Sequence, residues 1–297
     1  MSGPKTIRKP TLLDLFLLIT TMATWGLAFV AMKIVVPETG PYWLTAYRSL
    51  LGCLFVLPIA LWIGFSWPKD WGTWSKILLI SALMFSLPVV LISAAVEHLD
   101  AGVASLLMGT GPFLAILSGH FVAKDEKMTF AKVVAVVLGM AGILTIVGPE
   151  AVGNLGSANF YAQLTLIAAS ACYVTAGYTI RRIQMPFLPL TALCLLFGSM
   201  MMVPVSLILS GAPPISLTQN SLLWMLFLGV IASGLAFIVR FYLIQNIGYS
   251  MFALGVNMIP VFGVLMGALV LGEVITLKVA LALAFVMSGI FIARWGS

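Results

Sequence analysis

A set of polar and aromatic residues lies inside the long apolar stretches of this 297-residue chain. Hydroxyl and amide groups can hydrogen-bond the two ends of a zwitterion, and aromatic rings and methionine adapt to varied apolar surfaces. The pattern therefore predicts a binding site for a small solute. The predicted substrate-binding residues are Trp25, Ser86, Met108, Thr110, Tyr173, Tyr178, Ser233, Asn257 and Arg240. For each serine or threonine, a hydrogen bond to its own helix backbone is the alternative interpretation.

Two breaks stand at similar places in two of the apolar stretches. One reads Gly109-Thr110-Gly111-Pro112 and the other reads Asn257-Met258-Ile259-Pro260. Interrupted backbone inside a membrane leaves carbonyl and amide groups that need partners, and it often marks the binding site of a transporter. The alternative is that these prolines only bend helices for packing. The predicted helix-break or gating residues are Pro88, Gly109, Gly111, Pro112 and Pro260.

Charged residues within the apolar stretches are functional candidates because an ion in lipid is costly. We predict that Arg240 contacts the substrate or a gate. Arg48 is expected to pair with Glu38 or Glu97 at the outer surface. Either arginine could instead extend its head group to the nearer interface. Every carboxylate lies in a predicted loop or near a helix end, which disfavours proton-coupled antiport of cationic drugs.

Patterns typical of an enzyme are missing from the sequence. No paired aspartates, serine with histidine or metal-ligand spacing occur inside the apolar stretches, and no nucleotide-binding loop is present. Cys53, Cys172 and Cys194 show no paired spacing and are interpreted as packing residues. His120 is interpreted as structural. We therefore predict no catalysis, no metal, no cofactor and no use of ATP.

The elements that position these side chains are long apolar helices. Charged residues make up 8% of the chain and apolar residues 62%, whereas a soluble domain has about 25% charged residues. Because no water-soluble fold could bury so much apolar surface, the predicted class is an all-α polytopic membrane protein. Its ten predicted transmembrane helices cover residues 12–36, 42–64, 75–97, 102–122, 129–147, 158–181, 188–210, 221–245, 251–271 and 277–294.

The basic residues predict how these helices are oriented. Lysine and arginine gather on the loops of one side, and only Lys278 falls on the loops of the other. This asymmetry places both termini in the cytoplasm, because cytoplasmic loops carry the excess of positive charge. The net charge of +6 therefore reports membrane topology and does not predict nucleic-acid binding. The expected location is the cell inner membrane, with the lipid bilayer as partner.

The two halves of the chain resemble each other after a shift of about 147 residues. Thr45, Ala46, Gly52 and Pro58 recur with the same spacing as Thr191, Ala192, Gly198 and Pro204. The predicted repeats cover residues 1–148 and 158–297, joined by a linker at 149–157. Because each repeat has five helices, an odd number, the second copy is predicted to enter the membrane from the opposite side. Such inverted repeats are typical of alternating-access carriers.

Several of these features resemble the drug/metabolite transporter superfamily, specifically its EamA-type members. The resemblance covers nearly the whole chain and rests on the five-plus-five plan, Pro112 and Pro260, and an acidic residue and threonine that follow each proline. Those following residues are Glu126, Thr129, Glu273 and Thr276. The first repeat reads Lys124-Asp125-Glu126 where the family more often has Gly-Glu, as in Gly272-Glu273, which puts the role of Glu126 in doubt. Within the family, the sequence looks most like bacterial YddG-type exporters of aromatic and other neutral amino acids.

The resemblance implies a secondary transporter that exports neutral, including aromatic, amino acids or related metabolites by alternating access. Export of sugar phosphates, nucleotides or drugs is one alternative. A non-transporting membrane scaffold is another, in which Gly263 and Gly267 would pair helices within the fold or between chains. The expected oligomeric state is a monomer or a weak homodimer.

Overall fold

The computed structural model describes residues 8–122, 129–153, 156–180, 183, 185–247, 252 and 255–295. Within these ranges every regular element is a helix. Six of the described helical stretches are long and apolar enough to cross a membrane, and three further apolar helices are shorter. The predicted all-helical membrane class is therefore confirmed.

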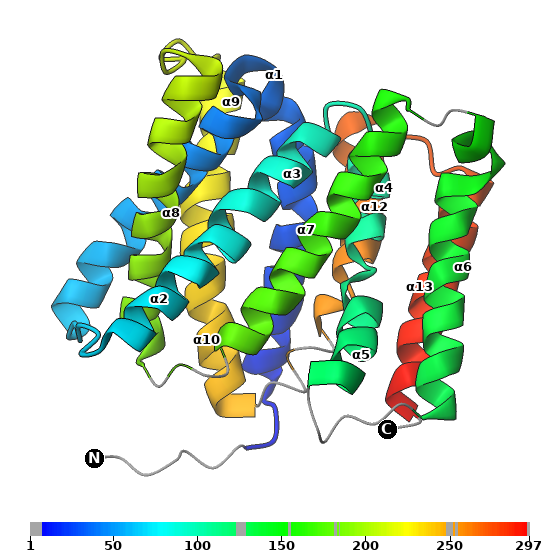
Figure 1. Cartoon of the computed structure of the whole chain (residues 1–297), viewed down its shortest axis with the longest axis horizontal. Helices are drawn as coiled ribbons and strands as arrows, with labels where there is room; N and C mark the ends of the chain where they lie inside the picture. Colours follow the sequence, from blue (N-terminus) through cyan, green and yellow to red (C-terminus); the bar gives the residue numbers. More distant parts are fainter. Residues whose placement is uncertain are drawn as a thin grey trace.

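The first helix, α1 (Leu12–Ile63), contains two of the predicted transmembrane segments, 12–36 and 42–64. Gly40 is its one residue with non-helical torsions, at φ 66° and ψ 165°. Glycine adopts this positive φ without the steric cost that a Cβ would add. Figure 1 shows α1 running to one end of the bundle, turning there and returning beside α8 (Phe187–Ser210).

Two stretches change from α-helix to the wider π-helix partway along their length. π-Helical segments are uncommon and frequently occur at functional sites. Pro88 explains the first one, because its ring lacks an N–H and collides with the carbonyl four residues earlier. The elements are α2 (Trp71–Ile80), η1 (Ser81–Ser86) and α3 (Leu87–Ala95), and then α9 (Gln219–Leu226), η2 (Phe227–Leu235) and α10 (Ala236–Ile247).

Both predicted helix breaks are present in the structure. α4 (Ala101–Met108) ends at a turn formed by Gly109 and Thr110, and α5 (Gly111–Val122) begins directly after it. α12 (Ile259–Leu271) begins after a turn at residues 257–258. Pro112 and Pro260 each occupy the second position of the new helix, where a missing backbone N–H costs nothing.

The remaining helices complete a bundle in which segments far apart in sequence lie side by side (Figure 1). α13 (Leu277–Trp295) packs along α6 (Phe130–Gly153), and α3 packs along α7 (Ala158–Ile180). α12 packs against α4, and α1 packs against both α8 and η2. Each half of the chain therefore makes its main contacts with the other half.

Glycines allow some of these helices to approach closely. Gly263 on α12 lies directly against the side chain of Ser105 on α4, so a Cβ there would overlap it. Gly267, one turn later, faces Gly102 and Glu273. Of the two predicted roles for this small-residue face, the described contacts show helix pairing within the chain.

Large apolar side chains cover much of the outer surface. Trp62 is 89% exposed, Ile208 is 81% exposed and Leu269 is 78% exposed. Water would disfavour such a surface, whereas lipid tails solvate it at no cost. The exposed apolar belt thus agrees with a protein whose solvent is the bilayer.

Candidate functional site

Trp25, in the first half of α1, packs among aromatic rings and bonds to the π-helix η2. Its indole Nε1 donates a hydrogen bond of 3.1 Å to the carbonyl of Ala232. Its ring centroid lies 5.6 Å from that of Phe237 and 6.1 Å from that of Phe252. Trp25 also contacts three apolar clusters of the interior, so it lies where several helices meet.

Arg48, in the second half of α1, is buried with only 9% of its surface exposed. Its Nε donates a 2.7 Å hydrogen bond to the hydroxyl oxygen of Ser233, which follows Ala232 in η2. Its Nη1 lies 3.5 Å from the sulfur of Met32, a weak acceptor. The guanidinium therefore reaches the same turn of η2 as Trp25.

The predicted pairing of Arg48 with Glu38 or Glu97 is wrong. Glu38 instead accepts hydrogen bonds from the backbone N–H and hydroxyl of Thr218 and from the hydroxyl of Ser221. These donors form the exposed N-terminus of α9, where a carboxylate is favoured by the orphan N–H groups and the helix dipole. Glu97 is exposed. Arg48 turns inward because the hydroxyl of Ser233 lies within its reach.

Arg240, on α10, lies over the same two aromatic rings that surround Trp25. Its guanidinium carbon is 5.6 Å from the ring centroid of Phe237 and 5.5 Å from that of Phe252. A guanidinium over an aromatic face gains a cation–π attraction that strengthens away from water. The structure therefore brings Trp25 and Arg240, both predicted from the sequence, against the same two aromatic rings.

Tyr173, on α7, packs against two of the interior clusters that Trp25 also contacts. Its hydroxyl is within electrostatic range of the guanidinium groups of Arg48 and Arg240. These side chains form one group, which we call the Trp25 cluster. Its members are Trp25, Arg48, Tyr173, Ser233, Phe237, Arg240 and Phe252.

The other predicted hydroxyl residues bond elsewhere. Ser86 donates to the carbonyls of Ser81 and Gly198. The hydroxyl of Tyr178 donates to the carbonyl of Ala115 on α5. Of these bonds, only the one from Ser86 to Ser81 is the local backbone bond of the alternative interpretation, whereas those to Gly198 and Ala115 join different helices.

Met108 and Thr110 contact a residue that the sequence analysis did not select. Ser170, on α7, lies 3.4 Å from the sulfur of Met108 and 3.4 Å from the hydroxyl of Thr110. Asn257 lies in the turn before α12 and is partly buried. Ser170 and Tyr173 are three residues apart on α7 and therefore share one face of that helix. The helix break of α4 and the Trp25 cluster thus contact the same face of α7.

The two helix breaks contact each other. A Cβ placed on Gly109 would lie 2.8 Å from the ring carbon Cγ of Pro260. Pro88 lies in the first turn of α3, and Gly111 and Pro112 open α5. The breaks thus lie where α4 and α12 cross, beside the Trp25 cluster.

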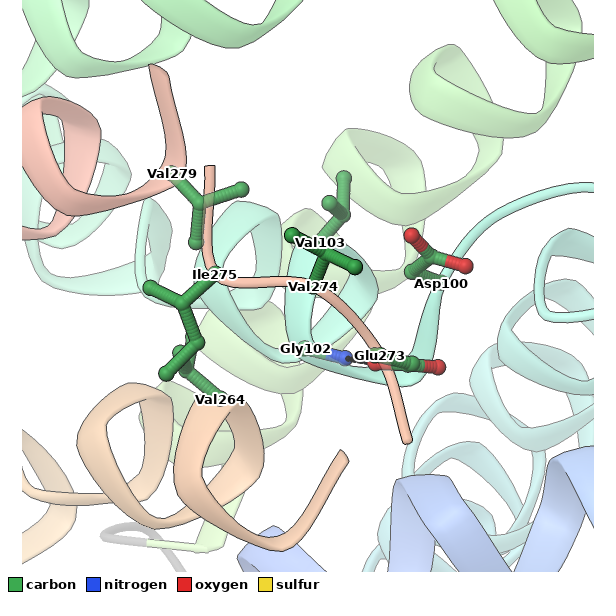
Figure 2. A pocket seen from close by; sticks show the side chains of 8 residues that line it. All are labelled: Asp100, Gly102, Val103, Val264, Glu273, Val274, Ile275 and Val279. Carbon is green, nitrogen blue, oxygen red and sulfur yellow. Dashed lines mark hydrogen bonds between the residues drawn. The ribbon is translucent and has the colours of Figure 1, made fainter. Parts of the chain in front are cut away.

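A second charged group, which we call the Glu273 cluster, comprises Lys33, Asp100, Glu273 and the N-terminus of α4. Glu273 accepts hydrogen bonds of 2.7 and 2.9 Å from the backbone N–H groups of Ala101 and Gly102. The Nζ of Lys33 lies 3.2 Å from Glu273 and 3.0 Å from Asp100. Figure 2 shows Glu273 beside the first turn of α4. Lys33 lies within the apolar stretch 12–36 of the sequence, and a charge at such a position was the available signal for this cluster.

Two small cavities accompany these groups. One, of about 10 Å³, lies beside Glu273 and is lined by Asp100, Val264 and neighbouring residues (Figure 2). Another of about 10 Å³ lies among η1, α8 and Phe237, and its lining includes Phe85 and Leu190. The rings of Phe85 and Phe237 are in contact, with centroids 4.9 Å apart and planes tilted by 46°. This apolar cavity therefore borders the Trp25 cluster, but at this size it admits only a water-sized molecule.

Metal chemistry finds no support in the described part of the chain. No group of three or more histidine, cysteine, aspartate or glutamate side chains is placed there to hold a metal ion. The side chains of His120, Lys124, Asp125 and Glu126 lie outside the described residues.

Comparison with known proteins shows similarity to membrane transporters. The model of the EamA-like transporter family matches residues 12–148 and again residues 160–295. An uncharacterized transporter of Bacillus subtilis, YoaV, is 25% identical over 280 residues, covering 92% of this chain and 94% of that protein. A probable amino-acid metabolite efflux pump of Salmonella typhimurium is 24% identical over 303 residues, covering 95% of each chain. A solved crystal structure shares the fold at a TM-score of 0.67 and 20% identity, over 95% of this chain and 97% of that one.

Proposed function

The chain belongs to the EamA-like transporter family and is a multi-pass inner-membrane protein, and from this premise we propose what it carries and how. It is a secondary transporter that exports neutral, including aromatic, amino acids or related small metabolites by alternating access. The observation that carries this proposal is the Trp25 cluster, in which aromatic rings adjoin a buried arginine and a hydroxyl group. Such a surface suits a solute with an apolar body and a charged end.

Inverted repeats would give the chain its two conformations. The proposed repeats are residues 1–148 and 158–297, with a linker at 149–157. Two matches of one family model support this division. The helix contacts support it too. The packing of α3 on α7 has its counterpart in the packing of η2 on α1. In addition, α4 packs on α12 and α6 packs on α13, and each of these pairs joins helices in corresponding positions of the two repeats. Both termini are proposed to face the cytoplasm.

The helix breaks are the proposed gating elements. Gly109 and Pro260 touch across the boundary between the halves, so α4 and α12 can pivot there with few backbone bonds to lose. Pro88 and Pro112 lie in first helical turns and have no backbone N–H to lose, and Gly111 opens α5 beside Pro112. The apolar cavity by Phe237 must widen to admit a solute, and motion at these breaks would widen it.

The test uses purified protein in liposomes loaded with labelled L-phenylalanine. Wild type is expected to release the label down its gradient, and Trp25→Phe is expected to slow release about tenfold, since a lost hydrogen bond to a polar group is worth about 1–2 kcal/mol. Trp43→Phe is the matched control. Trp43 is buried, whereas Trp25 is partly buried, and the Nε1 of Trp43 likewise donates to a backbone carbonyl, that of Gly211 at the end of α8.

A second matched pair tests the assignment of Tyr173. Tyr173→Phe is expected to slow release severalfold, whereas Tyr47→Phe, which loses a hydroxyl bonded to the carbonyl of Pro214, is expected to leave it unchanged. Equal rates for wild type, Trp25→Phe and Tyr173→Phe would remove the Trp25 cluster from the transport path. Failure of the wild type to release any of the twenty amino acids would refute the proposed function.

A further inference from the structure

The position of Arg48 is unusual for a cation in a membrane protein. It lies eight residues after the turn at Gly40, or roughly 12 Å along the helix. Its partner Ser233 lies midway in the segment from Gln219 to Ile247, fourteen residues from either end. Charged side chains at such depth usually pair with an opposite charge or with a ligand.

The described part of the chain offers Arg48 no opposite charge. The three ion pairs found there involve Arg8 and Lys33 and none involves Arg48. Its hydrogen bonds reach a neutral hydroxyl and a thioether, through Nε and Nη1. The guanidinium has five N–H donors in a planar fork that matches a carboxylate, and within the described residues only Nε and Nη1 meet a protein acceptor.

A second guanidinium, that of Arg240, adds to the positive charge of this region. The hydroxyl of Tyr173 is within electrostatic range of both Arg48 and Arg240. Arg240 in turn lies over the rings of Phe237 and Phe252. Two cations and a phenol in a low-dielectric surrounding attract an anion more strongly than they would in water.

We propose that Arg48 is the subsite for the carboxylate of the transported solute, with the apolar body of the solute against Trp25 and Phe237. This inference rests on the proposed function and names the chemical group that the carrier recognises. Adjacent residues of η2 set the spacing: Ser233 bonds Arg48 and Ala232 bonds Trp25. Because Ala232 and Ser233 are neighbours in the chain, the guanidinium of Arg48 and the indole of Trp25 both reach the same turn of η2.

The experiment measures the affinity of the purified full chain in detergent for three probes that differ in one group. L-Phenylalanine has both a carboxylate and an amine, 3-phenylpropionate has only the carboxylate, and L-phenylalaninamide has only the amine. Both carboxylates are expected to bind wild type at least tenfold more tightly than the amide does. Arg48→Gln is expected to lose at least tenfold affinity for the two carboxylates and to bind the amide as before.

Further variants show whether the loss comes from the charge. Arg48→Lys keeps a positive charge without the fork and is expected to lose less affinity than Arg48→Gln. Arg8→Gln removes an arginine outside the Trp25 cluster and is expected to bind all three probes like wild type. If Arg48→Gln does not fold, Ser233→Ala replaces it, because removing the hydroxyl that orients the guanidinium should weaken both carboxylates severalfold.

Specific results would overturn the inference. It is wrong if the amide binds as tightly as phenylalanine, if neither carboxylate binds, or if Arg48→Gln and Ser233→Ala bind both carboxylates like wild type. Liposome release separates this failure from that of the proposed function. Release of phenylalanine by Arg48→Gln at the wild-type rate leaves the transporter in place and removes the subsite. Arg48-dependent binding of 3-phenylpropionate without release of any amino acid leaves the subsite in place and refutes the proposed substrate.

Discussion

Lys33 and Arg48 lie on the same helix, α1, at similar distances from its turn, yet their surroundings differ. Lys33 is seven residues before Gly40 and Arg48 is eight residues after it. Lys33 is 28% exposed and has two carboxylates within 3.2 Å. Arg48 is 9% exposed and bonds only neutral groups in the described part of the chain. The protein neutralises the more exposed cation and leaves the more buried one for another molecule to neutralise.

This difference separates a structural charge from a functional one. Glu273 lies in the second half of the chain and binds the N-terminus of α4 in the first half, so the Glu273 cluster fastens the two halves together. Glu38 does the reverse by binding the N-terminus of α9 from the first half. Under the proposed alternating access, these contacts must separate whenever a solute passes this end of the protein. The Trp25 cluster also links the halves, because Arg48 bonds Ser233, but Arg48 forms no ion pair within the described part of the chain.

The largest effect on stability is expected for Glu273→Ala. The change leaves two backbone N–H groups and Lys33 without their acceptor, and the free energy of unfolding should fall by about 2–4 kcal/mol. Unfolding in detergent, followed by circular dichroism, measures this. Glu97→Ala, which removes an exposed carboxylate, is the control and should have no effect. Equal stability of the two variants would contradict the structural role of the Glu273 cluster.

Arg48→Met is expected to change stability in the opposite direction. Removing a buried ion that lacks a counter-charge should raise the free energy of unfolding by about 1–2 kcal/mol, while release of phenylalanine from liposomes falls at least tenfold. Arg8→Met is the contrasting variant. Because Arg8 pairs with the fully buried Asp14, its loss should destabilise the protein. If Arg48→Met unfolds more easily than Arg8→Met, Arg48 is a structural residue and the comparison fails.

The smallest effect is expected for Lys33→Met. Glu273 keeps its two backbone donors in this variant, and Lys33 is partly exposed, so the loss should be about 0.5–1 kcal/mol. Salt screens such a pair, and the difference from wild type should therefore shrink as sodium chloride rises from about 50 mM to about 1 M, over which the Debye length falls severalfold. Lys69→Met, at an exposed position, should show no difference in either salt. A loss that does not depend on salt would mean that Lys33 is as well shielded as Arg48.

Much of the fold could be predicted because lipid imposes simple rules on sequence. Hydropathy and length predicted most of the described helix ends to within a few residues, although α6 continues to Gly153, beyond the predicted end at residue 147. The breaks at Gly109 and Pro260 were predicted from residue type alone. The π-helices were less predictable, since only Pro88 signalled the first and no proline accompanies the second. A widened turn depends on how neighbouring helices pack, which a single sequence does not state.

The candidate site was predicted only in part. Trp25, Tyr173, Ser233 and Arg240 were selected from their residue types, and the structure brings them into one cluster. Arg48 was expected to point outward and instead points inward. Ser86 and Tyr178 were selected on the same grounds as Ser233, but they bond to backbone carbonyls. Residue type shows what a side chain can bind, and only its neighbours show what it does bind.

The sequence by itself determined the solvent of this protein, the positions of its helices and the places where they break. These properties depend on local composition, because each apolar stretch must satisfy its own backbone hydrogen bonds in lipid. The tertiary structure alone decided that Glu273 caps α4 and that Arg48 meets Ser233 across 185 residues of chain. Electrostatic pairing acts over a few ångströms in space regardless of separation in sequence. For that reason, Arg48, which the sequence suggested would pair with a carboxylate, has no counter-charge in the described part of the chain.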